Sequence, residues 1–224
     1  MILESSDIFN RRINKKDLMI EPWHLERLQP ASYEISLDSK FLIFDPLLKC
    51  IDAEHPGDYT RWVDIDDNEQ PWYDEGAYIM RPGEFILGSS VECFTFPDDL
   101  AGELTGKSSI GRLGIQVHST AGFFDPGFNG TATLEISNIS PVPIRLQPGL
   151  VIAQMRFVKL SRSSQWAYGH PERNSHYQGQ RGPTPSRLGS RDMVRPIVDV
   201  QPSMAGEQLQ LPGVDWSQYE THGR

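Results

Sequence analysis

Short runs of alternating apolar and polar residues dominate the chain. In residues 32–38, Tyr33, Ile35 and Leu37 alternate with serine and glutamate. A period of two is typical of a strand that buries one face. Similar runs predict further strands over residues 41–44, 77–80, 84–87, 91–96, 131–137, 144–146 and 151–160.

Turn signals separate these runs, and helical signals are sparse. Pro-Gly pairs at 82–83, 126–127 and 148–149 mark turns. One short helix is predicted over residues 6–13, where Ser5-Ser6-Asp7 can cap the first turn. Many short strands without alternating long helices favour an all-β barrel or jelly roll over a parallel α/β sheet.

The pattern divides the chain into a β domain, residues 1–188, and a C-terminal tail, residues 189–224. Residues 51–76 are acidic and poor in aliphatic side chains, so we expect a long surface excursion there. The tail loses all periodicity yet keeps several apolar residues, so we expect it to lie along a surface or a neighbouring subunit.

Composition and charge narrow the classes of function. Hydrophobic residues make up 38% of the 224 residues, enough for a core. With 21 Lys and Arg against 30 Asp and Glu, the formal charge is −9, which argues against a non-specific nucleic-acid binder. A small anionic ligand stays compatible, because a pocket can be basic on an acidic surface.

We expect a cytoplasmic protein with no membrane partner. No apolar run approaches the roughly 18 residues of a membrane span, and the first residues lack the apolar stretch of a signal peptide. Cys50 and Cys93 are too far apart in sequence for a paired-cysteine zinc site. We expect both to be small buried hydrophobes in a reducing compartment.

Residues 106–112, Gly-Lys-Ser-Ser-Ile-Gly-Arg, bring two cations and two hydroxyls together. Backbone N–H groups of a short helical turn and the arginine fork can both bind phosphate oxygens. A P-loop is disfavoured, because Ala101 stands where its first glycine belongs and Gly111 interrupts the helix it requires. A polar surface turn stays open as the alternative.

The strand predicted at residues 131–137 carries a candidate proton-transfer group. Alternation puts Thr133 and Glu135 on the face opposite Leu134. If that face lines a pocket, Glu135 is a carboxylate on a rigid element, suited to moving protons. A solvent-facing glutamate is the alternative. His118 alone is more typical of packing, and Asp125 before Pro-Gly of a turn.

Together, these segments resemble the dCTP deaminase branch of the dUTPase superfamily in order and spacing. The matching segments are residues 106–112, 118–127, 133–135 and 177–187, with further matches at 82–88 and 147–154. Residues 28–37 resemble an early strand motif of the family, with Glu34 where aspartate is usual. The resemblance covers residues 1–187, and the tail is longer than we expect for the family.

The resemblance implies a distorted jelly-roll β-barrel, assembled as a homotrimer with active sites shared between subunits. It also implies a bound dCTP or dUTP nucleotide with Mg²⁺. The metal would be held through phosphates and water, so no protein ligand cluster is implied.

Position by position, the resemblance implies a nucleotide site made of Lys107, Ser108, Ser109, Ile110, Gly111, Arg112, Asp125, Thr133, Leu134, Glu135, Gln154, Tyr168, His176 and Gln180. The segment 107–112 would surround the triphosphate and base, Asp125 the deoxyribose, and residues 133–135 the base. His176 stands where the family usually has lysine. Neutral imidazole is a weaker phosphate partner, so we expect lower affinity or a pH dependence near neutrality.

The implied reaction is hydrolytic deamination at C4 of cytosine. Glu135 would take the proton of the attacking water and deliver it to the leaving ammonia, Ser108 would orient the water, and Arg112 would support charge. Zinc deaminases instead pair H-x-E with P-C-x-x-C, a combination that this sequence lacks.

A finer choice concerns the product. Family members that release dUTP tend to carry a basic pair after the Thr-Ala step, whereas here Gly122-Phe123 follows Thr120-Ala121. This pair favours a dual enzyme that continues to dUMP and pyrophosphate. A dUTP-releasing deaminase, a plain dUTP pyrophosphatase and a catalytically silent nucleotide sensor are the alternatives. Retention of Ser108, Arg112 and Glu135 disfavours the last two.

Overall fold

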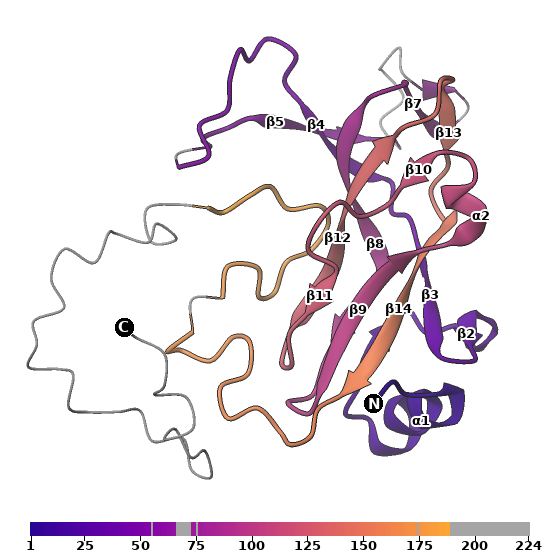
Figure 1. The fold of residues 1–224 in the computed structure, drawn as a ribbon, viewed down its shortest axis with the longest axis vertical. Helices are drawn as coiled ribbons and strands as arrows, with labels where there is room; N and C mark the ends of the chain where they lie inside the picture. Colours follow the sequence, from indigo (N-terminus) through magenta and orange to yellow (C-terminus); the bar gives the residue numbers. More distant parts are fainter. Residues whose placement is uncertain (55, 66–72, 75, 174, 189–224) are drawn as a thin grey trace, which may run out of the picture.

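The computed structural model describes residues 1–188 except 55, 66–72, 75 and 174 (Figure 1). The elements in chain order are α1 (Ser5–Phe9), a π-helical turn (Asn10–Lys15), β1 (Met19–Glu21), a 3-10 turn (Leu25–Arg27), β2 (Leu28–Gln29), β3 (Ser32–Ser36), β4 (Lys40–Phe44), β5 (Thr60–Asp64), β6 (Tyr73–Asp74), β7 (Ala77–Met80), β8 (Phe85–Thr95), β9 (Leu100–Gly106), α2 (Ser108–Gly111), β10 (Ile115–Gln116), β11 (Phe123–Phe124), β12 (Asn129–Asn138), β13 (Ile144–Leu146) and β14 (Val151–Lys159). The all-β prediction is confirmed. The predicted tail, 189–224, lies outside the described residues.

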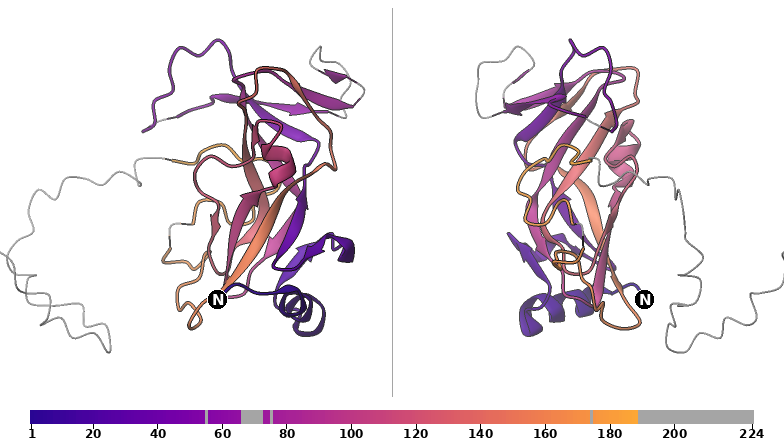
Figure 2. Two further views of the ribbon diagram at one scale, coloured as in Figure 1. Left: turned by 45° about the vertical axis from the view of Figure 1, so that its right-hand side comes forward. Right: turned by 90° about the vertical axis from the view of Figure 1, so that its left-hand side faces the viewer.

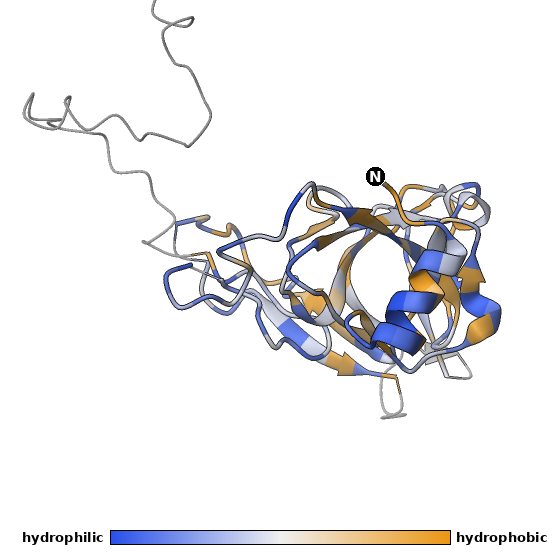
Figure 3. Cartoon of the chain, turned by 90° about the horizontal axis from the view of Figure 1, so that it is seen from below, coloured by the Kyte–Doolittle hydropathy of each residue, from blue (hydrophilic) through white to orange (hydrophobic). Residues whose placement is uncertain are grey.

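The strands form three antiparallel sheets. The first has the order β10-β12-β8-β4-β5 with β1 added to β8, the second β11-β9-β14-β3-β2, and the third β13-β7-β6. Figure 3 shows the sheets curving around a shared interior, as in a jelly roll. Figure 2 shows α1 at one end of the molecule and the hairpin of β4 and β5 at the other.

Strand β12 shows why the alternating pattern produces this layout. Ala132, Leu134 and Ile136 are fully buried in the core. Thr133 and Glu135 lie half-buried on the opposite face. Burial of apolar area drives the apolar face of β12 into the core. The opposite face is therefore left for polar side chains.

Several predicted boundaries change in the structure. The predicted strands at 84–87 and 91–96 form one strand, β8, and β9 was not predicted. The helix predicted over residues 6–13 begins one residue earlier, at Ser5, and becomes π-helical from Asn10; its cap is Glu4, whose carboxylate accepts from the N–H groups of Ser6 (3.0 Å) and Asp7 (3.1 Å).

Two other expectations are wrong in part. Residues 51–76 are not merely a surface excursion, because β5 pairs with β4 and Val63 is buried. Pairing with β4 gives the backbone N–H and C=O groups of β5 their hydrogen-bond partners, so a strand forms within this acidic segment. Cys50 is exposed rather than buried, and Cys93 is half-buried.

A β-bulge interrupts the pairing of β8 with β12. Cys93 lies opposite Thr131 and Ser89 opposite Thr133, so three residues of β8 face Ala132 alone. The Ser90 hydroxyl fills the gap by accepting from the Ala132 N–H at 2.8 Å. The bulge therefore sets the register of the β12 segment that carries Thr133 and Glu135.

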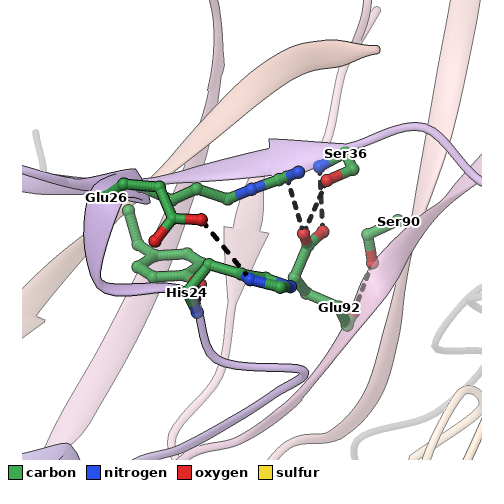
Figure 4. Close-up of polar contacts among 7 residues, drawn as sticks. His24, Glu26, Ser36, Ser90 and Glu92 are labelled. Carbon is green, nitrogen blue, oxygen red and sulfur yellow. Dashed lines mark hydrogen bonds and ion pairs between the residues drawn. The ribbon is translucent and has the colours of Figure 1, made fainter. Parts of the chain in front are cut away.

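A buried carboxylate anchors this bulge (Figure 4). The Glu92 side chain accepts from the Ser36 N–H (2.9 Å), the Ser36 hydroxyl (2.8 Å) and Arg27 Nη1 (3.1 Å). Its own carbonyl accepts from the Ser90 hydroxyl at 2.6 Å. Glu92 is 0% exposed, so these partners replace the water that its charge has lost. The network ties β3 and the 3-10 turn to the bulge.

A second ion pair predicts acid-dependent stability. Arg11 Nη1 donates to Asp99 Oδ2 at 2.9 Å, and this hydrogen bonding holds the pKa of Asp99 below its ordinary 3.8. Because the folded pKa is lowered, the ionised Asp99 stabilises the fold at pH values above the ordinary pKa. That stabilisation is lost as pH falls through the folded pKa.

Asp99→Asn should therefore lower the free energy of unfolding at pH 7 by about 1.5–3 kcal/mol. The deficit should be smaller at about pH 3, because the stabilisation from the lowered pKa is progressively lost as pH drops below the ordinary 3.8 toward the folded value. Urea unfolding at both pH values measures it. The exposed neighbour Asp98, changed to Asn, is the control. An Asp99→Asn deficit of equal size at both pH values would contradict the linkage.

Candidate active site

A cavity of about 500 Å³ opens on the polar face of β12. This size falls within the range of small-molecule sites. Its lining residues are Phe44, Tyr59, Phe85, Leu87, His118, Ala121, Phe123, Phe124, Asp125, Phe128, Thr133, Glu135, Tyr168, Tyr177, Gln180, Thr184 and Ser186. The predicted site residues that it brings together are therefore Asp125, Thr133, Glu135, Tyr168 and Gln180, with Phe123 beside them.

The Glu135 carboxylate is held in a defined orientation. Its Oε2 accepts from the N–H groups of Ser119 and Thr120, both at 3.1 Å, and from the Thr120 hydroxyl at 3.4 Å. These donors belong to the loop before β11, so the loop and β12 position the carboxylate together. A half-buried carboxylate fixed on a strand and facing a cavity can accept and return a proton.

Residues 180–188, here called the closing segment, run beside β12 (Figure 1), and Gln180, Thr184 and Ser186 of this segment line the cavity. The Gln180 side chain donates to the Thr131 carbonyl at 2.7 Å, and the Thr131 N–H donates to the Gln180 carbonyl at 3.2 Å. Further along, the Thr184 N–H donates to the Thr133 hydroxyl at 3.2 Å. One backbone hydrogen bond and two that use side chains thus attach the closing segment to β12.

Tyr59 is a cavity residue that sequence reasoning missed. Its hydroxyl accepts from the Ser186 N–H at 2.6 Å, which links the region before β5 to the closing segment. Its ring centroid lies 5.3 Å from that of Phe44, which lines the same wall. No local signal could have found Tyr59, because it stands between the polar residues Asp58 and Thr60 and its partners are distant in the chain.

The opposite wall is built from Asp125 and two tyrosines. Asp125 is exposed, and its carbonyl accepts from the Phe128 N–H at 3.1 Å, which confirms the predicted turn. The Tyr168 hydroxyl accepts from the Tyr177 N–H at 2.9 Å. Burial raises the pKa of Tyr168 above its ordinary value, so this hydroxyl is neutral at pH 7.

The segment 107–112 does not line this cavity. Ser108, Ser109, Gly111 and Arg112 are exposed on or beside α2, whereas Ile110 packs into the core. Figure 1 shows α2 and the closing segment on opposite sides of the sheets. Within one chain, the predicted catalytic set is therefore divided, with Glu135 in the cavity and Ser108 and Arg112 elsewhere.

Three other predicted residues, Lys107, Gln154 and Leu134, do not line the cavity. Lys107 forms an ion pair with Glu34, and Gln154 accepts from the Ser32 hydroxyl at 2.9 Å. Both contacts lie on the second sheet rather than in the cavity. The side chain of Leu134 is fully buried in the core.

His176 and Gly122 lie near the cavity. His176 is half-buried beside the closing segment, with Nδ1 3.2 Å from the Arg187 carbonyl oxygen. Gly122 is packed so closely that a Cβ there would lie 2.7 Å from the Leu104 carbonyl oxygen. The neighbouring Phe123 is 62% exposed at the cavity. Any larger residue at 122 would displace the loop that holds Glu135.

His118 also lines the cavity, and neither of its buried ring nitrogens has a hydrogen-bond partner among the described residues. Across those residues, no group of three or more His, Cys, Asp or Glu side chains is arranged to hold a metal ion. In the same part of the chain, no helix is long and apolar enough to cross a bilayer.

The fold and cavity are those of a β protein with a small-molecule site that a strand carboxylate faces. A family model described as dCTP deaminase-like matches residues 2–160. The chain therefore belongs to the dCTP deaminase-like family.

Named relatives agree with that assignment. A protein of Pseudarthrobacter chlorophenolicus named "dCTP deaminase, dUMP-forming" is 43% identical over 189 residues, spanning 84% of this chain and 95% of the relative. A protein of Leifsonia xyli with the same name is 46% identical, spanning 84% and 90%. The crystal structure of 2'-deoxycytidine 5'-triphosphate deaminase from Agrobacterium tumefaciens has a TM-score of 0.53 at 23% identity, covering 70% of this chain and 47% of that one. This last likeness supports the fold alone.

Proposed function

We propose that this protein is a hydrolase that converts dCTP to dUMP, ammonia and pyrophosphate. The observation that carries the proposal is Glu135, held by two backbone N–H groups at the wall of a cavity of suitable size. The names of the relatives, which are dUMP-forming dCTP deaminases, support the same substrate and product. The enzyme would act in pyrimidine deoxynucleotide metabolism in the cytoplasm.

In the first step, the oxygen of a water molecule bonds to C4 of cytosine while Glu135 takes its proton. Glu135 then gives a proton to the exocyclic nitrogen, the C4–N4 bond breaks, and ammonia leaves. A positioned proton carrier of this kind typically contributes about 10²–10⁴-fold to the rate. In the second step, the oxygen of a water molecule bonds to the α-phosphorus. The bond between the α-phosphorus and the oxygen that bridges it to the β-phosphorus breaks, which releases dUMP and pyrophosphate.

The chain's own oxygen donors fit a role for Mg²⁺ carried by the nucleotide. The ion would be held mainly by phosphate oxygens and water, and the exposed carboxylate of Asp125 at the cavity would accept hydrogen bonds from that water. When bound, the ion would neutralise phosphate charge.

We also propose that the active unit is a homotrimer in which a second copy supplies Ser108 and Arg112 to the Glu135 cavity. The division of these residues within one chain is the first support. The second is an exposed apolar group beside α2, made of Leu113, Ile139 and Val142. The Ile139 N–H donates to the Gly114 carbonyl at 2.8 Å, which brings the two loops together. Exposed apolar groups of this kind are suited to subunit contact.

Subunit mixing tests the shared site. Arg112→Ala and Glu135→Gln should each be inactive as pure proteins. When the two are co-expressed and mix at random, about a quarter of the sites should combine an intact Arg112 with an intact Glu135 and release ammonia from dCTP. Recovery of no activity would place both residues in one subunit's site and contradict the proposal.

The finer choice between products rests on the Gly122-Phe123 pair that follows Thr120-Ala121 and on the dUMP-forming names of the relatives. A time course with dCTP and Mg²⁺, following dUTP, dUMP, ammonia and pyrophosphate together, should show dUMP and pyrophosphate appearing early with little free dUTP. Accumulation of dUTP would instead identify a deaminase that stops after the first step. Absence of ammonia would contradict the deaminase proposal.

A further inference from the structure

The cavity has a charge mismatch with the nucleotide proposed for it. Its charged lining residues are the carboxylates Asp125 and Glu135, and among the described residues no Lys or Arg lines it. A nucleoside triphosphate brings several negative charges into this space. Cations at the edge of the cavity would therefore strengthen binding, whether they come from the same chain or from a second subunit.

Arg187 is an exposed cation of the closing segment that lies beside two residues of the cavity lining, Tyr177 and Ser186. Its guanidinium carbon lies 5.9 Å from the ring centroid of Tyr177, which lines the cavity. Its Nη1 donates to the His176 carbonyl at 2.5 Å. The preceding residue, Ser186, is itself a lining residue. The ring of Tyr177 and the hydrogen bond through Nη1 both restrict the Arg187 side chain, so it has lost much of its conformational freedom before any ligand binds.

The backbone of Arg187 is held as well. Its N–H donates to the Tyr177 hydroxyl at 3.2 Å, and its carbonyl oxygen lies 3.2 Å from His176 Nδ1. Residues 176–177 and Arg187 are thus joined by reciprocal contacts. These contacts are more than the closing segment needs to stay attached, because Gln180 and Thr184 already pair with β12.

Other arginines nearby are committed elsewhere. Arg181 donates through Nη1 to the Gln180 carbonyl (2.8 Å) and through Nη2 to Asn129 (3.0 Å). Arg173 lies over Trp166, 5.2 Å from the ring centroid, and lines a neighbouring cavity. A guanidinium has five N–H donors in a fork that matches phosphate oxygens, and the His176 carbonyl takes one of those of Arg187.

We propose that Arg187 binds the phosphate chain of the nucleotide, with His176 and Tyr177 as its positioning residues. The inference rests on the proposed function and adds to it a cation of the same chain. It also gives the half-buried His176 a positioning role that requires no charge on the imidazole. The contacts of His176 with Arg187 use the His176 carbonyl oxygen and Nδ1.

Equilibrium binding to the Glu135→Gln protein, in which turnover is blocked, tests this proposal. In that background, Arg187→Gln should weaken dCTP binding by about 10–100-fold, because a charge-assisted hydrogen bond is lost. Deoxycytidine, which has no phosphate, should bind equally with and without the change. Arg187→Lys keeps the charge but not the fork and should fall between the two. Arg162→Gln, at an exposed site after β14, is the matched control and should bind dCTP normally.

Two results would overturn the proposal. One is unchanged dCTP binding by Arg187→Gln. The other is an equal weakening of dCTP binding and deoxycytidine binding, which would show that Arg187 only holds the closing segment in place.

Inorganic tripolyphosphate separates this proposal from the proposed function. If the Glu135→Gln protein binds no dCTP, the proposed function fails. Tripolyphosphate binding then tests the role of Arg187 independently. Weaker tripolyphosphate binding after Arg187→Gln supports the phosphate contact, and unchanged binding, or no binding by either protein, overturns it.

Discussion

Replacing Glu135 by glutamine is expected to lower the rate of ammonia release from dCTP by about 10²–10⁴-fold while dCTP still binds. Glutamine has the size of glutamate, and its carbonyl oxygen can still accept from the N–H groups of Ser119 and Thr120. It cannot take a proton from water. The loss should therefore appear in kcat, with the dissociation constant of dCTP little changed.

Glu103→Gln is the matched control for this prediction. Glu103 is a half-exposed carboxylate on β9 that pairs with Arg156 at 2.7 Å, outside the main cavity. Its replacement should leave ammonia release intact. Wild-type protein that binds dCTP and releases no ammonia would instead indicate a nucleotide sensor. A Glu135→Gln protein with full turnover would remove Glu135 from the reaction.

Replacing the buried Glu92 by leucine should lower the free energy of unfolding by about 3–5 kcal/mol. The change leaves the Arg27 guanidinium and the Ser36 N–H without their carboxylate partner, at a position with no access to water. Glu92→Gln, which keeps some of these hydrogen bonds, should cost less. Chemical denaturation followed by fluorescence measures both values.

A double variant and a surface control sharpen the Glu92 prediction. Arg27→Met in the Glu92→Leu background should recover part of the loss, because it removes the unpaired charge. Glu26 is the control, since its side chain is 75% exposed and its contact with His24 spans 3.5 Å. Glu26→Gln should change stability by less than about 0.5 kcal/mol. A Glu92→Leu loss as small as this would contradict the anchoring role.

The elements that the sequence predicted well are those whose signal is local. Alternation placed Leu134 in the core and Glu135 on the other face, and the Pro-Gly pair after Asp125 marked a turn. Strand β9 was missed because its glycines weaken the strand pattern. Gly102 is needed there because a Cβ would lie 2.5 Å from the Phe96 ring.

The sequence by itself therefore determined the strand faces, the turns and, through the spacing of its motifs, the family to which the chain belongs. The tertiary structure decided what meets across the cavity. Tyr59 reaches Ser186, Glu92 anchors the bulge beneath Thr133, and Arg112 lies away from Glu135. Alternation and turn chemistry are properties of neighbouring residues. Contacts between distant segments depend on how strands pair and sheets curve, which no local pattern encodes.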